Sequence, residues 1–502
     1  MLVVGIDTSI LNVAIPTLVR DLGATPAELQ WIVDSYVLVF AGLLLTAGKL
    51  GDRYGRKGVM NVGLAIFVLA SIGAATSSTP DALIAWRATM GVGAALVMPA
   101  TLSILVNIFT EPRERRRAIA YWSLMNAAGA FIGPVTGGLL LRHFWWGSCF
   151  LVNVPFVTVA LILGHFWVPT SKDPDAAKRF DLLGAALSFI ALGALLWAVI
   201  EGPARGWTDP AIIGGFILSA AMIFAFVRWE LRVPDPMLDI ATLRSPQLSA
   251  AVIAMTIAFM AMTGSMYLIQ QALQLVKGYT PLAAALATSG PIVTVNFLVM
   301  PRAPGLTERF GARWMVASGS ALIAVASIII SLTTVSSGYF NLFVGFALMA
   351  LAFSIFTPAS TEAVMTAVPA EKAGGASAIN QMTRQLGQAL GVALTGSIAA
   401  SGYTSGFHLP AGLLPTGAVQ QAQSSITGAL EVARTVTGSV QVALLDAAHE
   451  AFLHGVRLAL LVAAVLAVAG AVYAAYAIPS GVGTEGTRDG AGDTMPDIII
   501  EA

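Results

Sequence analysis

The feature that most constrains this chain is a series of fourteen apolar stretches, each long enough to cross a lipid bilayer as a helix. A spanning helix needs about 20 mostly apolar residues, because hydrocarbon offers no water to satisfy backbone polar groups. Only 11% of the 502 residues are charged and 57% are apolar, whereas soluble domains carry about 25% charged residues. The sequence therefore predicts an all-α integral membrane protein with 14 transmembrane helices. The stretches lie at residues 1–19, 30–50, 58–77, 81–108, 118–141, 149–168, 182–200, 210–228, 247–272, 282–301, 314–334, 338–365, 376–400 and 453–477.

Basic residues in the connecting loops give the orientation of these spans. Short cytoplasmic loops collect Lys and Arg, and here a rich side alternates with a poor side. The rich side holds Arg53, Arg56, Lys57, Arg113, Arg115, Arg116, Arg117, Lys172, Lys178, Arg179, Arg228, Arg232, Arg244, Arg302, Arg309, Arg313 and Lys372. The poor side holds Arg20, Arg142, Arg205, Lys277 and Arg434. We therefore expect a multi-pass protein of the cell (inner) membrane with both termini in the cytoplasm.

A repeated loop divides the spans into two equivalent halves. The segment Gly48–Lys57, after the second span, aligns with Gly305–Arg313, after the tenth. Both segments fall on the basic side, so we expect parallel copies of six spans with a site between them at the membrane midplane. The matching residues are Asp52 with Glu308, Arg53 with Arg309, Tyr54 with Phe310, and Gly55 with Gly311.

The repeat and the polar segments predict the domain organisation. We expect an N-terminal six-helix bundle at 1–168, two inserted spans with their linkers at 169–246, and a C-terminal six-helix bundle at 247–478. The C-terminal bundle includes one long external loop at 401–452, with an amphipathic helix expected within 419–451. The tail 479–502, rich in Gly, Thr and Asp, is typical of disorder.

Further motifs lie in the spans of the first half and in the first repeated loop. The first span carries Asp7, Asn12, Val13, Ala14 and Pro16, and the second opens with Trp31, Asp34 and Tyr36. The fourth carries Arg87, Gly91 and Gly93, and the fifth carries Gly129, Gly133, Pro134, Gly137 and Gly138. The loop holds Gly48, Asp52, Arg53, Gly55, Arg56 and Lys57. This loop resembles the signature loop of the major facilitator superfamily. The fourteen predicted spans and the motifs within them resemble its drug:proton antiporter branch.

The resemblance implies a fold and a class of activity. It implies two parallel six-helix bundles plus two inserted helices, and a cavity lined by spans one, four, nine and twelve. The opening of the second span is similar to that of exporters of quaternary ammonium compounds and dyes. The fifth-span motif is similar to that of antiporters, whereas Met90 stands where the fourth-span motif often has Gln.

The thirteenth span departs from the pattern of some quaternary-ammonium exporters. Those proteins carry adjacent acids there, but this chain reads Ile379-Asn380-Gln381-Met382-Thr383-Arg384. The departure disfavours export of divalent cations.

Ionisable residues within spans are costly and usually face a cavity or a partner. Asp7, Asp34, Arg87 and Glu362 meet this description. A carboxyl group in a low-dielectric cavity can take a proton on one side of the membrane and lose it on the other. We expect Asp7 to carry the coupled proton or to meet a cationic substrate, with Arg87 as its partner and Glu362 as a second candidate. The alternative for these residues is a static ion pair or a position at the membrane interface. For Asp34 the two interpretations are a gating role and an interfacial position.

Two other groups of residues suggest moving parts. Gly129, Gly133 and Gly137 share one face of the fifth span, where small residues let helices touch, and Pro134 removes a helical hydrogen bond. We expect this helix to pack closely at the interface between the halves; simple tight packing is the alternative. The repeated loops are expected to form contacts present in one conformation only, rather than acting solely as a topogenic charge cluster.

These observations predict proton-coupled export of small apolar or cationic compounds by alternating access. The alternative is a dedicated exporter of a single lipid, antibiotic or siderophore, and an importer, a membrane receptor or an enzyme is less favoured. No phosphate-loop pattern ending in Gly-Lys-Ser or Gly-Lys-Thr is present, so we expect no ATP hydrolysis. The single cysteine, Cys149, excludes an intramolecular disulfide. We expect no cofactor, metal or nucleic acid; the expected partners are a small-molecule substrate, protons and membrane lipid, and the protein should be monomeric.

Overall fold

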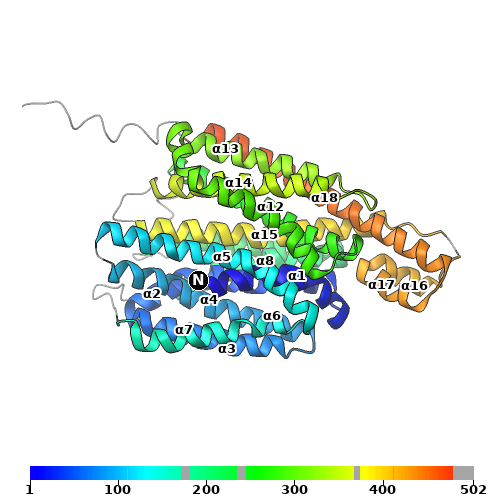
Figure 1. Cartoon of the computed structure of the whole chain (residues 1–502), viewed down its shortest axis with the longest axis horizontal. Helices are drawn as coiled ribbons and strands as arrows, with labels where there is room; N and C mark the ends of the chain where they lie inside the picture. The colour runs from blue at the N-terminus through cyan, green and yellow to red at the C-terminus, as the bar shows by residue number, and fades with distance from the viewer. Residues whose placement is uncertain (110, 171–180, 234–244, 367–372, 411, 479–502) are drawn as a thin grey trace, which may run out of the picture.

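The structure, a computed structural model, describes residues 1–109, 111–170, 181–233, 245–366, 373–410 and 412–478. Within these residues the regular elements are helices (Figure 1). The first group is α1 (Leu2–Leu22), α2 (Pro26–Tyr54), α3 (Arg56–Ala75), α4 (Pro80–Ile108), α5 (Pro112–His143), α6 (Ser148–Leu151), α7 (Asn153–Trp167), α8 (Leu182–Arg205) and α9 (Pro210–Glu230). The second is α11 (Pro246–Gln271) with a π-helical turn (Ala272–Val276), α12 (Pro281–Val299) with a 3-10 turn (Met300–Arg302), α13 (Ala303–Ser331), α14 (Phe340–Thr366), α15 (Ala373–Gly406), α16 (Thr416–Ser424), α17 (Ile426–Thr435) and α18 (Ser439–Ala477).

Twelve helical segments in the described part of the chain are long and apolar enough to cross a membrane. The short α6 and α7 together make one of them, Ser148–Trp167. Two further helices, α5 and α15, are 32 and 34 residues long but fall outside the twelve. The all-α membrane fold is therefore confirmed, whereas the number fourteen stays a prediction.

Threonine and proline fix where several spans begin. Thr25 accepts a hydrogen bond from the Glu28 N–H while Glu28 accepts one from the Thr25 N–H, which forms a capping box ahead of Pro26. Such reciprocal bonds satisfy two of the free amide groups at a helix start. The Thr280 side chain caps α12 ahead of Pro281 with a single hydrogen bond, accepted from the Ala283 N–H. These signals place the start of the second span four residues earlier than its apolar residues suggest.

The helices group as the internal repeat predicts. Within the first part of the chain, α1 packs on α5, α2 on α4, and α3 on both α4 and α7. Within the last part, α11 packs on α15, α13 on α14, and α18 on α11, α13 and α15. We call these groups, α1–α7 and α11–α18, the first and second halves. The exact domain boundaries stay a proposal, which this packing supports, and the tail 479–502 lies outside the described residues.

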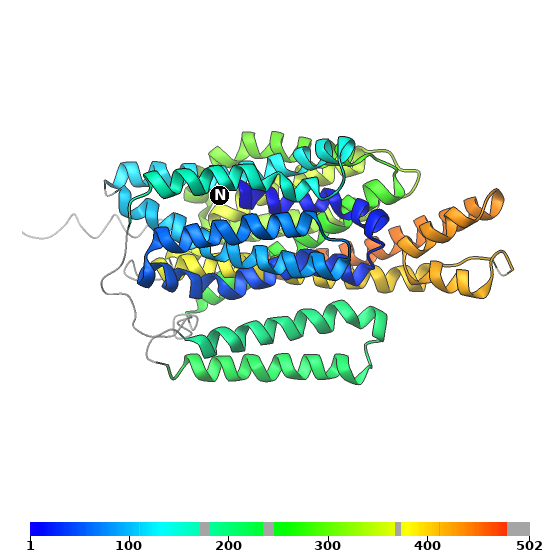
Figure 2. The same ribbon diagram turned by 90° about the horizontal axis from the view of Figure 1, so that it is seen from below.

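The two halves meet along a few helices. α2 contacts α15 and α5 contacts α12, so each of these two contacts joins one half to the other. The inserted pair α8 and α9 forms an antiparallel hairpin beside the bundle (Figure 2), and α8 contacts both α2 and α15. The insertion therefore lies against both halves.

One end of the bundle carries an additional layer of helices. α16 and α17 lie beyond the ends of the other helices, next to the start of α18 (Figure 1); we call this the cap end. We call the opposite end, where α2 turns into α3 at Gly55, the corner end. The predicted loop 401–452 is accordingly mostly helical: α15 extends to Gly406, and α18 begins at Ser439. The expected amphipathic helix is divided among α16, α17 and the first turns of α18.

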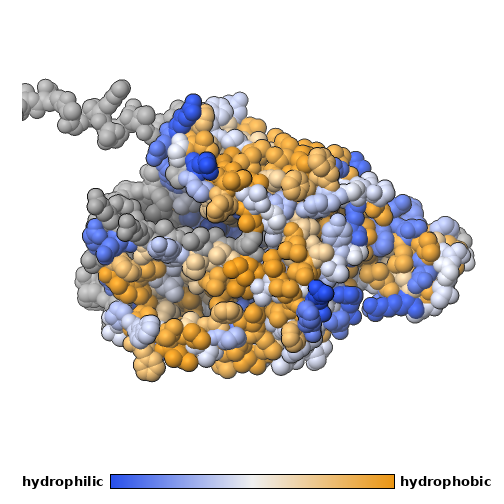
Figure 3. Space-filling view, in the orientation of Figure 1, coloured by the Kyte–Doolittle hydropathy of each residue, from blue (hydrophilic) through white to orange (hydrophobic). Residues whose placement is uncertain are grey.

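The surface of the protein fits a membrane. Apolar residues cover the middle of the molecule in the face shown, and hydrophilic residues gather toward its two ends (Figure 3). Large apolar side chains such as Phe166, Phe297 and Tyr476 are more than 70% exposed. An apolar surface of this extent would be unfavourable in water and is expected where lipid is the solvent.

Candidate functional site

A buried ion pair lies inside the first half. Arg87 in α4 donates from Nη1 to Asp7 Oδ2 in α1 over 2.7 Å. Asp7 is 0% exposed and Arg87 is 1% exposed. Both side chains are therefore enclosed by the helices around them. The structure thus brings together the two residues that the sequence predicted as partners.

Two other helices complete the surroundings of this pair. Asn153 in α7 donates to the second carboxylate oxygen of Asp7 over 3.0 Å. The Nε of Arg87 donates to the carbonyl of Ile32 in α2 over 3.0 Å, and its guanidinium lies 4.4 Å from the ring centroid of Tyr36. The charged groups therefore have hydrogen-bond partners and an aromatic face in place of water, which offsets the cost of burial.

A glycine allows α4 to approach α2 closely enough for these contacts. A Cβ at Gly91, one turn beyond Arg87, would lie 2.6 Å from the carbonyl oxygen of Tyr36. Real side chains do not tolerate such a contact with backbone, so a larger residue would push the two helices apart. The spacing of Arg87 and Gly91 in the fourth-span motif therefore has a geometric cause.

Asp34 is buried but stands apart from the pair. It is 0% exposed, and neither carboxylate oxygen has a hydrogen-bond partner in the described part of the chain. It lies eight residues into α2, about 12 Å from the helix start, because α2 begins at Pro26 and not near residue 30. Because residues two apart on a helix point about 200° apart, Asp34 and Ile32 face opposite sides of α2.

The side that Asp34 faces belongs to the second half. The phenol of Tyr267 in α11 interacts electrostatically with Asp34. Gln30, one turn earlier on the same face, lies 3.5 Å from the hydroxyl of Ser397 in α15. Asp34 is thus an acid without a partner among the described residues, at the junction of the halves.

A small, partly open pocket lies next to this junction at the cap end. Its lining combines apolar side chains with amide, phenol and hydroxyl groups, and no charged residue takes part. The lining includes Leu29, Gln30, Tyr267, Gln271, Gly396, Tyr403, Ser425 and Phe452. Such a surface suits a small, mostly apolar molecule, with Asp34 one turn from Gln30.

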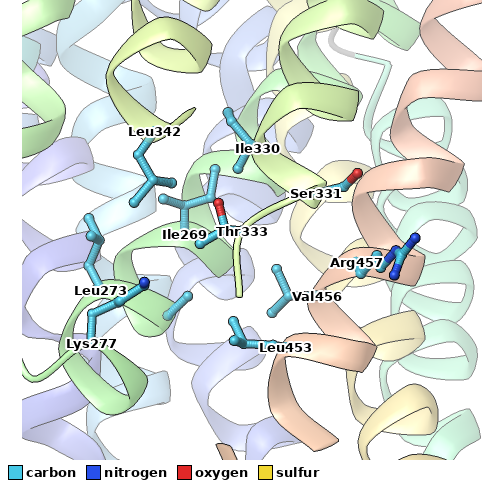
Figure 4. A pocket seen from close by; sticks show the side chains of 11 residues that line it. Ile269, Leu273, Lys277, Ile330, Ser331, Thr333, Leu342, Leu453, Val456 and Arg457 are labelled. Atoms are coloured by element: carbon cyan, nitrogen blue, oxygen red, sulfur yellow. The ribbon is translucent and has the colours of Figure 1, made fainter. Parts of the chain in front are cut away.

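A second pocket lies within the second half and is separate from these acids. Aliphatic side chains from four helices surround it, and Lys277 and Arg457 lie on opposite sides (Figure 4). Lys277 Nζ donates to the carbonyls of Val335 and Ser337, and burial lowers the pKa of its ammonium group. This lysine thereby ties the end of the π-helical turn to the loop after α13.

Glu362 does not join the site. It is exposed near the end of α14 and interacts electrostatically with Glu308 in α13, which belongs to the second repeated loop. The expectation of a second proton carrier beside Asp7 therefore finds no geometric support, because the fold places Glu362 at the corner end.

The two repeated loops have the same local geometry. Gly55 has φ 108° and Gly311 has φ 78°, values that side chains with a Cβ rarely adopt. The guanidinium of Arg53 lies 5.4 Å from the ring centroid of Tyr54, and Arg309 lies 5.4 Å from that of Phe310. The repeat is thus structural as well as sequential. Gly48 lies within α2 and Arg56 and Lys57 open α3, whereas the Asp52 side chain is outside the described set.

The glycine face of α5 packs inside the first half, not between the halves as expected. A Cβ would lie 2.2 Å from the Leu2 carbonyl at Gly129, and 2.8 Å from the Ile6 carbonyl at Gly133. Gly137 packs in the same way on α1. Pro134 lies within the continuous helix α5.

The inter-half contact of α5 belongs instead to Gly138. A Cβ at Gly138 would lie 2.5 Å from the Cα of Leu282 in α12. The second half has its own equivalent of the glycine face, because Gly387 and Gly391 of α15 approach the backbone of α11.

Sequence reasoning missed Asn153 and assigned no role to Tyr36. An asparagine within an apolar span is a signal that could have found Asn153. Among the residues that the structure describes, no three His, Cys, Asp or Glu side chains come together as a metal site requires.

Comparison with known proteins matches this architecture. The family model of the Major Facilitator Superfamily matches residues 1–392. The chain is 35% identical over 473 residues to the multidrug efflux pump LfrA of Mycolicibacterium smegmatis, covering 94% of this chain and 93% of that protein. It is 36% identical to the methyl viologen resistance protein SmvA of Salmonella typhimurium, covering 91% and 92%. It is 31% identical to the tetracenomycin C resistance and export protein of Streptomyces glaucescens, covering 95% and 89%.

Solved structures give the same fold. A bacterial homolog of the human lysosomal transporter Spinster, in an inward-facing and unoccupied conformation, superposes with a TM-score of 0.64 at 17% identity. The alignment covers 95% of each chain. On the family match, the relatives and the paired helical halves, this chain belongs to the major facilitator superfamily of membrane transporters.

Proposed function

We propose that this protein exports small apolar or cationic compounds in exchange for protons. The observation that carries the proposal is the buried pair of Asp7 and Arg87, a titratable group inside an otherwise apolar bundle. The printed functions of the relatives, multidrug efflux and drug resistance, support the same direction of transport. The protein moves its substrate and is not an enzyme.

The proposed first step is proton uptake by Asp7. In the structure Asp7 accepts hydrogen bonds from Arg87 and Asn153. A proton on Asp7 removes the charge that holds Arg87 and leaves Arg87 bonded to the Ile32 carbonyl. Since a buried cation without its anion is unfavourable, protonation favours a rearrangement of α1 against α4.

Asp34 takes the second part in this mechanism. A carboxylate without a partner in an apolar surrounding is costly, so it binds either a proton or the cationic group of a substrate. The nearby pocket supplies apolar surface for the rest of such a molecule. Competition between a proton and a cation for Asp34 would couple the two fluxes.

Alternating access requires the halves to separate at one end at a time. One buried core extends across both halves and includes Leu29, Tyr36, Tyr267 and Ala393, together with residues of α17. Near the corner end, buried residues form separate clusters, one around Met60 and another around Leu248. This pattern supports a conformation closed at the cap end, and rocking would open it.

The remaining assignments belong to the same proposal. We assign the cap end to the outside of the cell membrane and both termini to the cytoplasm, on the distribution of basic loop residues. The repeated loops around Gly55 and Gly311 would then form contacts specific to one conformation on the cytoplasmic side. We propose a monomer that works with substrate, protons and lipid.

A dedicated exporter of one compound is the second candidate. It is favoured by the 31% identity to a protein named for a single compound, tetracenomycin C. Competition among chemically unrelated compounds for uptake into inverted vesicles separates the two: mutual inhibition indicates a polyspecific pump.

The proposal is tested by proton release from inverted vesicles on addition of candidate drugs. We expect Asp7→Asn to abolish drug-driven proton movement while the protein still inserts normally, because an amide cannot exchange a proton at neutral pH. The parent protein in matched vesicles is the control. Exchange at the parental rate in Asp7→Asn would show that another group carries the proton.

A further inference from the structure

Arg384 is a cation inside α15 that the mechanism above does not use. Its guanidinium lies 5.0 Å from the ring centroid of Phe259 in α11. Phe259 is in turn packed edge-on against Phe353 and Phe356. Among the described residues, no carboxylate and no hydrogen-bond acceptor pairs with Arg384. This contrasts with Arg87, which has an acid, a carbonyl and an aromatic ring.

Arg384 lies on the face of α15 that turns toward α11, next to the face that meets the first half. Gln381 donates to the sulfur of Met98 in α4 over 3.3 Å, and residues three apart share one helix face. Asn380, four residues before Arg384, is 9% exposed and has a carbonyl oxygen without a partner. Arg384 itself retains partial exposure. Asn380, Gln381 and Arg384 together form a polar strip on α15, which Gln381 joins to α4.

The chemistry of arginine defines what can occupy this strip. A guanidinium presents five N–H groups in a planar fork that matches a carboxylate or phosphate with two parallel hydrogen bonds. The Phe259 ring can satisfy one face of the cation but accepts no such pair. An arginine left with N–H groups unbonded at this depth is costly, so the site is incomplete without an anion.

We propose that Arg384 binds the anionic group, a carboxylate in the first instance, of the transported compound. This inference deepens the proposed function and rests on it, because it names the substrate class. α2 and α15 run antiparallel, with Gln30 beside Gly396. Asp34 lies four residues from that contact and Arg384 lies twelve, so the two charges are about 12 Å apart along the bundle.

A single compound can therefore reach both charges. Its cationic group would lie toward Asp34 and its anionic group toward Arg384, with an apolar body between them. Zwitterionic amphiphiles of this length should be favoured over compounds that carry two positive charges, since the second charge would be repelled by Arg384.

The test compares two dyes that differ in one group: rhodamine 6G, an ethyl ester with one positive charge, and the zwitterionic acid obtained by its hydrolysis. Binding to the purified protein in nanodiscs is measured by fluorescence polarisation. We expect Arg384→Gln to weaken binding of the acid about tenfold, the effect of losing a hydrogen-bonded charge pair, and to leave the ester within twofold. Arg384→Lys should restore part of the affinity for the acid.

A matched control removes an arginine elsewhere. Arg434 in α17 is exposed, and Arg434→Gln should leave both dyes unchanged. The dication methyl viologen is the opposite probe, and its binding should tighten in Arg384→Gln. Equal weakening of both dyes in Arg384→Gln, or no change in either, overturns the inference.

The same variants separate this inference from the proposed function. Export of the ester into inverted vesicles, with and without a pH gradient, tests the proton-coupled pump alone. If ester export ignores the gradient while acid binding still depends on Arg384, the coupling proposal fails and the anion site stands. If ester export follows the pH gradient and Arg384→Gln changes the binding of both dyes equally, the proposed anion site is wrong and the proposed proton-coupled export is supported.

Discussion

Asp7 and Arg87 form a contact that is costly for folding and that, in the proposed mechanism, serves transport. Each charge alone would be strongly unfavourable where the pair lies, at 0% and 1% exposure. The cost is offset by the contacts with Asn153, Ile32 and Tyr36. Because the balance depends on one proton, the pair can be stable in one protonation state and strained in the other.

Stability and transport should therefore separate in a double-mutant experiment. We expect Arg87→Leu to lower the stability of the protein by about 3 kcal/mol, because Asp7 is left buried without its cation. Adding Asp7→Leu should restore most of that loss, since an apolar pair of similar volume is often as stable as a buried ion pair. Thermal unfolding in detergent measures both.

The double variant should nevertheless fail to exchange protons for drug in vesicles. Recovery of exchange together with stability would contradict the role given to this pair. The single variant Asn153→Leu is a useful comparison, because it removes one hydrogen bond to Asp7 and leaves both charges in place.

At this scale the sequence indicated which residues form the buried pair, but it did not indicate which neighbouring helix each side chain faces. The charge type and the span positions were enough to predict that Asp7 and Arg87 would meet. The separation of Asp34 from Arg87 depends on which face of α2 turns toward which neighbour, and this follows from packing. The role suggested for Glu362 stays a prediction, and its exposure near the end of α14 gives that role no support.

At the scale of elements, α5 shows that neighbouring glycines can have different tasks. Gly129, Gly133 and Gly137 bind α5 to α1 within the first half, whereas Gly138 contacts Leu282 of the second half. The first three hold one bundle together, and the last allows the two bundles to close against each other. The sequence pattern shows small residues at helical spacing but not which neighbour each of them meets.

Alanine at these positions should therefore have different effects. We expect Gly133→Ala to lower the melting temperature, because its Cβ would lie 2.8 Å from the Ile6 carbonyl. Gly138→Ala should instead keep each half folded and favour opening at the cap end, because its Cβ meets Leu282. Distances between spin labels on α5 and α12 measure the opening by pulsed electron paramagnetic resonance.

The background for these labels is Cys149→Ser, since Cys149 is the chain's single cysteine. Gly214→Ala in α9 is the matched control: nothing lies within 4 Å of its added Cβ, and alanine is the better helix former by about 1 kcal/mol. An unchanged α5–α12 distance in Gly138→Ala would contradict the task given to that glycine.

Helix boundaries were the least predictable feature of the elements. The apolar residues of the second span begin near residue 30, but Thr25, Pro26 and Glu28 start the helix earlier. The apolar pattern also stopped short of the cap end, where α15 and α18 continue with mixed composition. Capping residues indicate where a helix begins or ends, whereas hydropathy indicates which part of it lies in the membrane. Both signals are needed to predict the ends of a helix that extends beyond the bilayer.

At the scale of the whole molecule, two halves related by an internal repeat surround a junction that is continuous with the buried core. The pairing of the halves was predictable, because the matching loops around Gly55 and Gly311 mark equivalent positions in the two halves. The position of the inserted hairpin was not, since α8 and α9 have no counterpart in the repeat.

A cross-link at the cap end should stop the transport cycle. The Cβ of residue 396 would lie 3.0 Å from Cγ of Gln30, so Gln30→Cys with Gly396→Cys falls near the distance that a disulfide needs. In the Cys149→Ser background we expect oxidation to abolish export and reduction to restore it. Export from inside-out vesicles before and after reduction is the measurement.

A cross-link within the inserted hairpin is the matched control. The added Cβ of residue 215 would lie 3.1 Å from the Cβ of Ala198, so Ala198→Cys with Gly215→Cys joins α8 to α9 without joining the halves. Export should continue when this pair is oxidised. Continued export with the oxidised cap-end pair would contradict rocking of the halves.

The placement of α8 has a consequence for how such a protein could move. Phe189 of α8 lies against Gly42 of α2, and the carbonyl of Val199 accepts a hydrogen bond from Ser397 of α15. The single helix α8 thus contacts both halves across the junction between them. In the proposed alternating-access cycle, each turnover would have to break one of these two contacts, so their strength would limit the rate of transport.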